Sequence, residues 1–500
     1  MPVNRNAVIA GQAGFSFAGF LFGQTARFGY NLVVARLLGV DALGTYALAI
    51  AVIQIAEVLA VAGLDSGLLR YVGLHSRDPL RQRAVIGSAL KTSITLSLFV
   101  AFLLLLFSAP IASKLNGSRL LQLTICCYAA AIPFNVATVL FGHAMQAFRK
   151  LKPKIIATQV LSPLLLLLLT ILFRYTAGQD AALFLPFALA GAGAFFWIRS
   201  RLFTISGVMP ADILHAHRDK AMLAYALPFM AVSLLSTMTY WLDVMMLGVL
   251  TDTATVGLYH PAARTAGLIR SVLFAFGGIA APMIAELHTG RQKAEIGRIY
   301  KMVTRWIVTV VFPPAILFMV LPEAVLSVFG ARFAAGGVVA LFLLTAASFL
   351  QATFGLSATV LAMTGHARLS LLNALAALGL QVTLNLLLIP RMGLNGAALA
   401  TLLLFLMLSA LRLVEIRRIL KIHPFGRALW KPLAAGLSAA LLLMALRPWL
   451  LTLPSFAGLA AGALLSLGSF TALMLLLKLE EEEREIILKY LPFLDKKPNQ

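Results

Sequence analysis

Long apolar segments recur along the whole chain and are separated by short polar turns. A transmembrane helix needs about 20 predominantly apolar residues, and fourteen segments satisfy this requirement. They cover residues 9–36, 43–69, 86–111, 120–147, 155–175, 181–203, 222–250, 255–285, 303–329, 334–363, 368–389, 394–420, 430–450 and 454–477. The pattern predicts an all-α polytopic membrane protein with about 14 transmembrane helices. A count of twelve stays open, because the sixth segment is weakly bounded and only Leu453 and Pro454 separate the last two.

Composition supports this prediction. Hydrophobic residues make up 60% of the chain and charged residues 12%, and the mean hydropathy is +0.92. These values lie outside the range of soluble globular proteins.

The distribution of basic residues predicts the topology. If the N-terminus is cytoplasmic, most of the 41 lysines and arginines fall on that side, and one of its loops is predicted to contain Arg70, Arg77, Arg81, Arg83 and Lys91. The opposite side carries only Arg36, Lys114, Arg119, Arg174, Arg332, Arg391 and Arg447. Because cytoplasmic loops accumulate Lys and Arg, we predict a multi-pass protein of the inner (plasma) membrane with both termini inside. The net charge of +22 is then explained mostly by basic residues on the cytoplasmic side, where they face anionic lipid headgroups. No nucleic-acid partner is therefore expected.

The chain contains an internal repeat. The sequence VDALGTYALA at 40–49 is reproduced by TATVGLYHPA at 253–262, so that Gly44 matches Gly257 and Tyr46 matches Tyr259 at an offset of 213. This predicts two parallel six-helix lobes, 1–212 and 213–425, related by an axis along the membrane normal and enclosing a substrate cavity. An additional transmembrane hairpin follows at 426–478. Residues 479–500 are predicted to form a cytoplasmic tail, which either contains a helix at the membrane interface or is a solvated, partly disordered end.

Five ionisable residues lie well inside predicted spans: Arg27, Glu57, Asp243, Arg264 and Arg270. A charge in the membrane is costly, so such residues face a cavity or a partner and mark functional sites. Three cations against two anions favour an anionic substrate, and the planar fork of arginine suits phosphate oxygens. We predict that Arg27 and Arg270 bind substrate and that Arg264 contributes to the site or serves as a gate or strut. Glu57 and Asp243 would couple transport to an ion or act as a gate.

Polar neighbours extend the predicted site on the first helix. Gln24, Arg27 and Asn31 share one face at helical spacing, which a lipid-facing helix would not readily tolerate. His143 and His260 also fall in spans, where satisfied interhelical hydrogen bonds are a commoner role than proton transport.

A purely structural interpretation of the five charges stays open at this point. Asp243 would then pair with Arg264 across the hairpin between the seventh and eighth helices. Glu57 would bridge Arg27 or Arg270 and hold the lobes together.

Several motifs resemble a known family. Residues 33–72, VVARLLGVDALGTYALAIAVIQIAEVLAVAGLDSGLLRYV, contain an A-R-x-L-G turn, a following G-x-Y and a final G-L-D-x-x-x-x-R. This run resembles the first two helices of polysaccharide and oligosaccharide-lipid flippases. The segment YALPFMAVSLLSTMTYWLDVMMLGVL, followed by VGLYHPAAR, resembles the second half of the same family. The resemblance implies the multidrug/oligosaccharidyl-lipid/polysaccharide exporter superfamily, whose V-shaped members alternate between inward-open and outward-open states.

The resemblance also implies a substrate. Lipid II flippases are similar in size, but their Arg- and Asp-rich first hairpin is absent here, and multidrug cation antiporters usually depend on an acidic cavity. The expected function is a flippase that moves a lipid-pyrophosphate-linked oligosaccharide, such as an O-antigen or exopolysaccharide repeat unit, from the inner to the outer leaflet. Its expected partners are the lipid-linked oligosaccharide, the lipid bilayer, a coupling ion (proton or sodium), and a polysaccharide polymerase with glycosyltransferases.

No enzyme is expected from this sequence. It has no metal-ligand cluster with usable spacing, no phosphate-cradling glycine loop and no nucleotide-binding domain, so no cofactor, metal or catalytic residue is predicted. Two alternative functions remain: a multidrug or ion-coupled antiporter of the same superfamily, and a membrane polysaccharide polymerase or ligase. The second would need a substantial external loop, and all predicted external loops are short.

Overall fold

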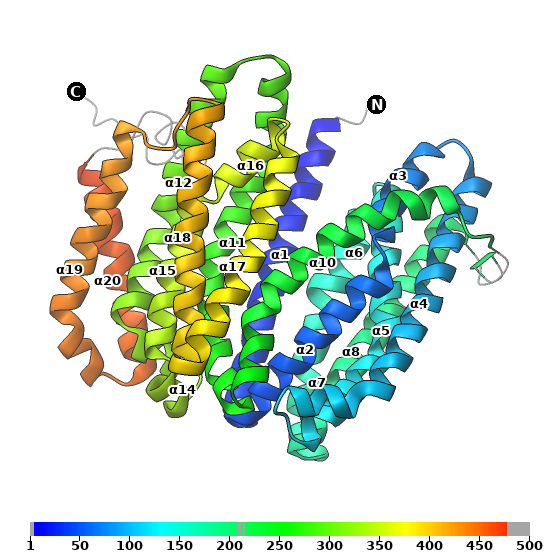
Figure 1. Cartoon of the computed structure of the whole chain (residues 1–500), viewed down its shortest axis with the longest axis horizontal. Coiled ribbons are helices and arrows are strands. Elements are labelled where there is room, and N and C mark those ends of the chain that lie inside the picture. Colours follow the sequence, from blue (N-terminus) through cyan, green and yellow to red (C-terminus); the bar gives the residue numbers. More distant parts are fainter. Residues whose placement is uncertain (1–4, 209–211, 214–215, 478–500) are drawn as a thin grey trace, which may run out of the picture. The chain divides into compact units, whose positions relative to one another are not determined.

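The chain folds into helices joined by short turns (Figure 1). Its structure, a computed structural model, describes residues 5–208, 212–213 and 216–477; the helix predicted in the tail lies outside them. No strand occurs in this part of the chain. The first half contains α1 (Arg5–Leu37), α2 (Gly39–Val61), α3 (Leu64–Leu74), α4 (Pro79–Lys114), α5 (Arg119–Ala147), α6 (Leu151–Ile155), the π-helix η1 (Ile156–Leu161), α7 (Ser162–Thr176), α8 (Gln179–Ser206) and α10 (Lys220–Leu250). The second half contains α11 (Thr253–Thr289), α12 (Lys293–Val320), α13 (Pro322–Ser327), α14 (Ala331–Gly336), α15 (Val338–Phe354), α16 (Leu356–Met363), α17 (Ala367–Met392), α18 (Leu394–Ile419), the 3-10 helix η2 (Arg427–Leu429), α19 (Trp430–Thr452) and α20 (Ser455–Leu476).

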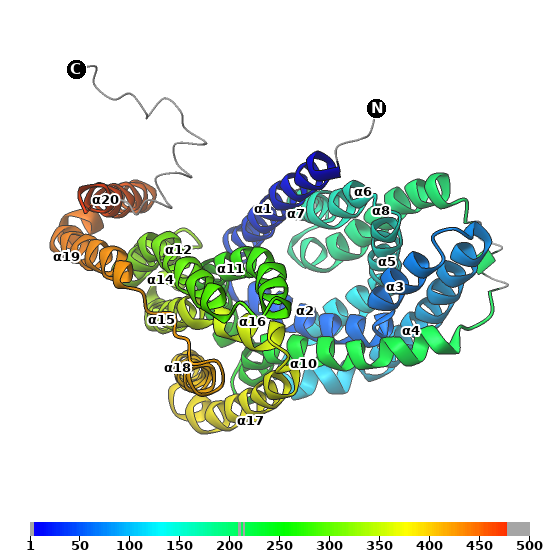
Figure 2. The same cartoon turned by 90° about the horizontal axis from the view of Figure 1, so that it is seen from above.

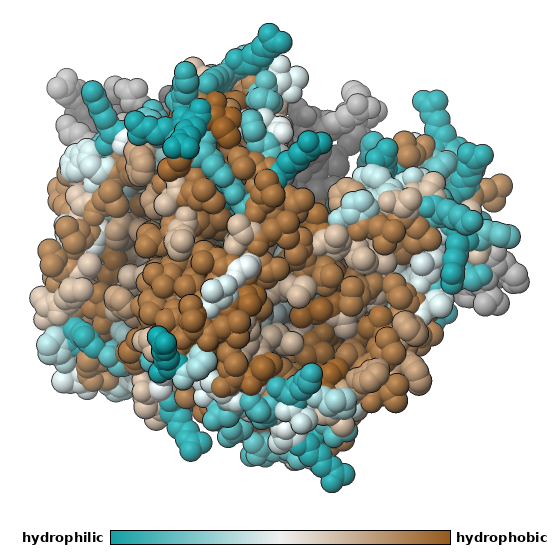
Figure 3. Space-filling view, viewed as in Figure 1, coloured by the Kyte–Doolittle hydropathy of each residue, from teal (hydrophilic) through white to brown (hydrophobic). Residues whose placement is uncertain are grey.

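Most of these helices can cross a bilayer. Within the described residues, 13 helical segments are long and apolar enough to do so. The helix α1 is not among them because its polar residues interrupt its apolar character, but its 33 residues exceed the length that a span requires. Figure 3 shows hydrophobic side chains covering the middle of the visible face and hydrophilic ones gathered at the helix ends. The chain is therefore a multi-pass, all-α membrane protein, as predicted.

Three predicted spans are interrupted helices. The second span breaks between α2 and α3, where Ala62 and Gly63 adopt φ values of 52° and 70°. A side chain at Gly63 would meet the carbonyl of Ala226 on α10, so the break allows these backbones to approach closely. The ninth span ends at Leu321 before Pro322, and the tenth is divided into α14, α15 and α16. The prediction that Arg70, Arg81, Arg83 and Lys91 lie in a loop was wrong, because Arg70 is on α3 and the other three are on α4. The ammonium group of Lys91 donates a hydrogen bond to the carbonyl of Ala216 at 3.0 Å.

The described helices form two compact units. Unit 1 comprises residues up to His260 together with 389–394, and unit 2 comprises the remaining residues from Pro261 onward. This division follows contacts and falls within α11, so it does not test the lobe boundaries at 212 and 425, which stay predictions.

In unit 1, α5 is the central helix. It packs against α2, α3, α4 and α8, and Figure 2 shows it between α4 and α8. Its side chains include Tyr128, Ile132 and Leu140, all fully buried. The hydroxyl group of Tyr128 donates to the carbonyl of Leu183 on α8 at 3.0 Å. This buried polar group is therefore not left without a hydrogen-bond partner inside the membrane.

The two glycines of the internal repeat meet where α2 crosses the start of α11 in unit 1. A Cβ atom on Gly44 would collide with the carbonyl oxygen of Thr253, and one on Gly257 would collide with that of Val40. The contact is reciprocal, because Thr253 lies at the offset of 213 from Val40. Small residues at such crossings let membrane helices approach closely. The repeat sequence therefore encodes a contact between its own two copies.

Asp252, in the short turn before α11, caps the N-terminus of that helix. Its carboxylate accepts a hydrogen bond from the backbone N–H of Thr255 at 2.7 Å. Hydrogen bonds from the side chain and backbone of Thr255 lower the pKa of Asp252 below its ordinary value. An ionised aspartate at this position stabilises the N-terminus of the helix.

In unit 2, α12 contacts both helices of the C-terminal hairpin, α19 and α20. Two glycines allow this approach: a side chain at Gly436 would strike Phe312, and one at Gly462 would strike Leu321. The hydroxyl group of Ser466 donates to the carbonyl of Pro313 at 3.0 Å. The hairpin is thus packed on α12 by small residues and one buried hydrogen bond, as is common between membrane helices.

Candidate functional site

The predicted site residues divide between the two units. Unit 1 contains Gln24, Arg27, Asn31, Glu57 and Asp243. Unit 2 contains Arg264 and Arg270, both half-buried on α11. Each group is described within its own unit.

Arg27 is held by neutral oxygen acceptors on two helical segments. One guanidinium nitrogen donates to Oε1 of Gln24 on α1 at 3.3 Å. The other donates to Oε1 of Gln159 at 3.1 Å and to the carbonyl of Thr158 at 3.3 Å, both on η1. The side chain of Arg27 is nevertheless exposed. These amide and carbonyl oxygens orient the guanidinium group of Arg27.

The partner segment η1 has unusual geometry that the sequence did not predict. It is a π-helical turn inside an otherwise α-helical span, a feature often found at functional sites. Gly19 and Gly23 of α1 face this segment: a side chain at Gly19 would strike Ile155, and a Cβ atom on Gly23 would lie 2.6 Å from Oε1 of Gln159. This small-xxx-small spacing brings α1 close enough for Arg27 to reach η1.

Asn31 connects this arginine to a buried aromatic cluster. Its side-chain N–H donates to the carbonyl of Arg27 at 2.7 Å, as the predicted shared face requires. Its Oδ1 is therefore the acceptor for Nε2–H of His260, at 3.0 Å. Both Asn31 and His260 are buried, with 5% and 1% of their surface exposed. His260 has a satisfied interhelical hydrogen bond, as expected.

Aromatic rings surround His260. The ring of Trp241 on α10 is stacked on it with an interplanar angle of 8°, and the ring of Tyr46 on α2 meets it edge-on. The indole N–H of Trp241 donates to Oε1 of Gln54 at 2.9 Å. The cluster therefore joins α1, α2, α10 and the start of α11 within unit 1.

Glu57 has a different partner from the one that the structural interpretation expected. Its carboxylate accepts a hydrogen bond from the amide of Asn135 on α5 at 2.7 Å. No ion pair between Glu57 and Arg27 occurs among the residues that the structure describes. A bridge from Glu57 to Arg270 would join the two units and stays a prediction. Gly191 on α8 makes room for the amide, because a Cβ atom there would collide with Oδ1 of Asn135. Within unit 1, the neutral amide of Asn135 is therefore a partner of Glu57 that was not predicted.

Asp243 accepts a hydrogen bond from the hydroxyl group of Tyr259 at 3.0 Å. The predicted pair of Asp243 with Arg264 would join the two units and stays a prediction. Arg270 lies one turn after Gly267, and its guanidinium has no hydrogen-bond or ion-pair partner in the described part of the chain.

The aspartate and arginine of the G-L-D-x-x-x-x-R motif, Asp65 and Arg70, both contact side chains of neighbouring helices. Asp65 lies 4.0 Å from Nε2 of His143, whose Nδ1–H donates to the carbonyl of Val139. The same Nε2 lies 3.0 Å from the ammonium group of Lys154. Arg70 stacks over the ring of Tyr225 at 4.4 Å. His143 is thus another satisfied interhelical histidine.

A further polar pair in unit 2 was not predicted. The amide of Asn373 on α17, which is 4% exposed, donates to the carboxylate of Glu415 on α18 at 2.7 Å. Among the described residues, no group of three or more His, Cys, Asp or Glu is arranged to hold a metal ion.

Comparison with known proteins places these residues in a family context. A family model described as polysaccharide biosynthesis protein matches residues 11–288, which is more than half of the chain. The "Putative O-antigen transporter" of Shigella flexneri is 30% identical over 121 residues, covering 23% of this chain and 29% of that protein. The matched segment therefore spans less than a third of this relative.

Solved structures reveal the fold. The lipid II flippase MurJ in an inward closed conformation aligns with a TM-score of 0.75 at 13% identity, over 92% of this chain and 97% of that chain. An inward-facing multidrug resistance MATE family transporter of the MOP superfamily aligns with a TM-score of 0.70 at 15% identity, over 82% and 98%. The family model and these alignments together show that the chain belongs to the polysaccharide biosynthesis protein family and has the fold of MOP-superfamily transporters.

Proposed function

We propose that this protein is a flippase that moves a lipid-pyrophosphate-linked oligosaccharide, such as an O-antigen or exopolysaccharide repeat unit, from the inner to the outer leaflet. The observation that carries the proposal is the exposed guanidinium of Arg27, oriented by Gln24 and by Gln159 of the π-helical turn. Oriented arginine donors match the geometry of phosphate oxygens.

In this mechanism the pyrophosphate of the substrate replaces the neutral hydrogen-bond acceptors of Arg27. Phosphate oxygens compete with the amide oxygens of Gln24 and Gln159 for the N–H groups of Arg27, because charge-assisted hydrogen bonds are stronger than neutral ones. Asn31 holds the backbone of Arg27 and connects it to His260. Arg270 provides a second cation on α11, and Arg264 a third. The lipid tail would stay in the bilayer while the head group crosses by alternating access of the two predicted lobes.

The family supports this substrate class. Membership of a polysaccharide biosynthesis family and similarity to an O-antigen transporter favour a lipid-linked saccharide over a drug. The fold is compatible with either substrate, because it is shared with a lipid II flippase and with a multidrug transporter. On this proposal the protein resides in the inner (plasma) membrane with both termini cytoplasmic. It would receive its substrate from glycosyltransferases and deliver it to a polysaccharide polymerase, and it would perform no catalysis itself.

The test is leaflet transfer of a fluorescent lipid-pyrophosphate oligosaccharide in proteoliposomes. We expect Arg27→Ala to slow transfer by at least about tenfold, because it removes charge-assisted hydrogen bonds to phosphate. Arg27→Lys should recover little of the rate, since lysine lacks the planar fork. Arg119→Ala is the matched control: it removes an exposed arginine of the same unit from the end of α5. Wild-type rates for both Arg27→Ala and Arg270→Ala, in correctly inserted protein, would exclude the proposed site.

An ion-coupled multidrug antiporter is the second candidate, favoured by the carboxylate of Glu57 and its contact with Asn135. In the flippase, Glu57 and Asp243 would couple conformational change to entry of a proton or sodium ion. The antiporter instead predicts dye efflux that depends on Glu57 or Asp243 and does not respond to glycolipid. Measuring dye efflux and glycolipid transfer with Glu57→Gln and Asp243→Asn in the same proteoliposomes separates the two functions.

A further inference from the structure

A basic pocket in unit 2 lies outside the residues assigned above. It has a volume of about 440 Å³ and is formed by the first turns of α12, the segment after α18 and η2. Its lining includes Arg298, Lys301, Arg305, Ile422, His423 and Leu429. None of the described residues that line it is acidic.

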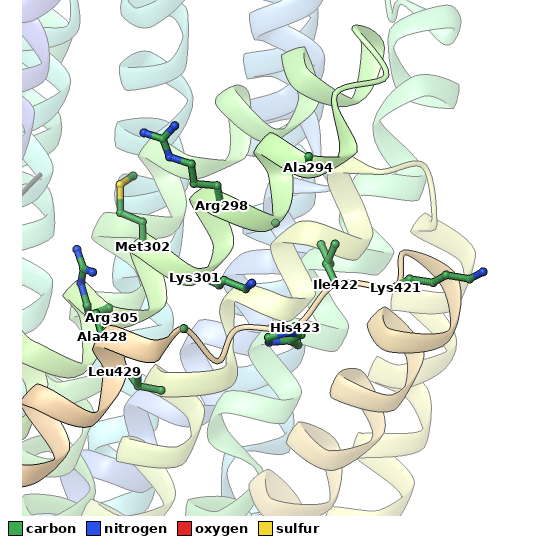
Figure 4. A pocket seen from close by; sticks show the side chains of 12 residues that line it. Ala294, Arg298, Lys301, Met302, Arg305, Lys421, Ile422, His423, Ala428 and Leu429 are labelled. Carbon is green, nitrogen blue, oxygen red and sulfur yellow. The ribbon is translucent and has the colours of Figure 1, made fainter. Parts of the chain in front are cut away.

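The cations of α12 lie along one side of the helix. Arg298, Lys301 and Arg305 follow the i, i+3, i+7 spacing that places side chains on a common face. Figure 4 shows Lys301 reaching toward the segment that carries Ile422 and His423, whereas the ammonium group of Lys421 extends away from it. Lys301 has no hydrogen-bond or ion-pair partner in the described residues. An ammonium group at the rim of a cavity without a carboxylate is suited to an anion.

Close packing builds the wall opposite α12. A Cβ atom on Gly297 would lie 3.3 Å from Ile422, and one on Gly426 would lie 3.7 Å from Lys301. Glycines at both positions therefore let the segment between α18 and α19 lie directly against α12. Lys421 adopts a φ of 53°, which turns the chain after the last turn of α18. The pocket is thus a formed part of the fold.

The surroundings of the pocket favour a lipid over a free anion. Trp430, which begins α19 directly after the lining residue Leu429, is 53% exposed, and Phe425 is 50% exposed. Exposed aromatic residues of this kind anchor membrane proteins at the headgroup level. From Trp430 an exposed apolar face runs along α19 through Leu433, Leu437, Leu441 and Met444. This face can accept acyl chains next to a headgroup in the pocket.

We propose that this pocket binds the phosphate headgroup of an anionic membrane phospholipid. Lys301 and Arg305 would bind the phosphate oxygens, His423 would contact the headgroup, and the acyl chains would lie on α19. Basic pockets between transmembrane helices on the cytoplasmic side are suited to anionic headgroups. The ligand is a resident lipid of the bilayer and not the transported glycolipid, so the proposal stands independently of the flippase function.

Native mass spectrometry of the purified full chain with phosphatidylglycerol tests this proposal. The test variant is Lys301→Gln with Arg305→Gln. The matched control is Arg417→Gln with Arg418→Gln, which removes two exposed charges from the adjacent end of α18. We expect the test variant to lose one bound phosphatidylglycerol, with affinity at that site falling by at least about tenfold. The control should stay within about twofold of the wild type.

Other outcomes would overturn the proposal. Equal losses in the two double variants would mean diffuse surface charge. Displacement of phosphatidylglycerol by millimolar inorganic phosphate would mean a site for free anions, and equal retention of phosphatidylcholine would mean no selectivity for an anionic headgroup. If the test double variant unfolds without lipid, Lys301→Gln alone provides the measurement, and wild-type binding by that variant would also reject the site.

Discussion

Replacing Gly23 by alanine should separate α1 from the π-helical turn η1. The new Cβ atom would lie 2.6 Å from Oε1 and 2.8 Å from the backbone oxygen of Gln159. The side chain can rotate away, but the backbone must withdraw by roughly 0.6 Å to restore ordinary van der Waals contact. Overpacking of this kind costs about 1–3 kcal/mol. Alanine also gains about 1 kcal/mol of helix propensity over glycine, so the net destabilisation is about 0–2 kcal/mol.

A second glycine on the same helix isolates the packing effect. A Cβ atom on Gly29 has no neighbour within 4 Å, so Gly29→Ala gains the propensity without the clash. The difference between the two variants should therefore be about 1–3 kcal/mol, with Gly23→Ala the less stable. Reversible unfolding in mixed detergent micelles, followed by tryptophan fluorescence, measures this difference.

The same displacement should affect transport. The hydrogen bond from Arg27 to Oε1 of Gln159 is 3.1 Å long, and a shift of about 0.6 Å takes it beyond hydrogen-bonding distance. Gly23→Ala should then slow glycolipid transfer, whereas Gly29→Ala should not. Equal stability of the two variants, within about 0.5 kcal/mol, would refute the packing argument.

Three further stability predictions use the same unfolding assay. Asn135→Ala should destabilise the protein by about 1.5–3 kcal/mol, because it removes the donor to the carboxylate of Glu57, and adding Glu57→Gln should recover part of the loss. Asp252→Ala removes the N-cap of α11 and should cost about 1 kcal/mol at neutral pH. Because hydrogen bonds lower the pKa of this carboxyl, its contribution is present above its ordinary pKa and lost as the pH falls through the lowered value, so the variant should approach the wild type in acid. Arg447→Ala should cost less than about 1 kcal/mol, since its 2.7 Å contact with Glu323 is half exposed, and a larger loss would contradict this estimate.

The helices could be predicted because membrane spans depend on local properties. A run of apolar residues of sufficient length identifies a span wherever it occurs. The segment predicted at 120–147 is helix Arg119–Ala147, and the one at 394–420 is Leu394–Ile419. The interruptions were not predicted, because they depend on neighbours. The break at Gly63 accommodates the backbone of α10, and the π-helical turn lies where α1 packs against it.

The site was predictable within one helix but not between helices. Gln24 and Asn31 were assigned to Arg27 because helical spacing fixes which side chains share a face, and hydrogen bonds now connect all three. Gln159 and Asn135 were missed because nothing local distinguishes a polar residue that faces a partner from one that faces elsewhere. Charge alone suggested arginine as the partner of a buried glutamate, whereas tertiary packing brings an amide of α5 to it.

The offset of 213 has a physical meaning beyond sequence similarity. Gly44 meets Thr253 while Gly257 meets Val40, so the same contact is made twice with the roles of the two copies exchanged. A larger residue at either position would collide with backbone, which explains why both copies contain glycine.

A second pair of equivalent positions makes contact in both copies. Tyr30 and Tyr46 form an edge-on ring pair with centroids 5.0 Å apart, and the residues 213 positions later, Asp243 and Tyr259, form a 3.0 Å hydrogen bond. Equivalent positions are therefore in contact in both copies of the repeat, but the residues differ: one copy has an aromatic pair and the other has a tyrosine bound to a carboxylate. The same offset relates Glu57 to residue 270, where the chain has an arginine. Two copies with one scaffold and unlike charges could bind an anion through one copy and a cation through the other. The proposed ion-coupled transport of an anionic lipid would require such an asymmetry.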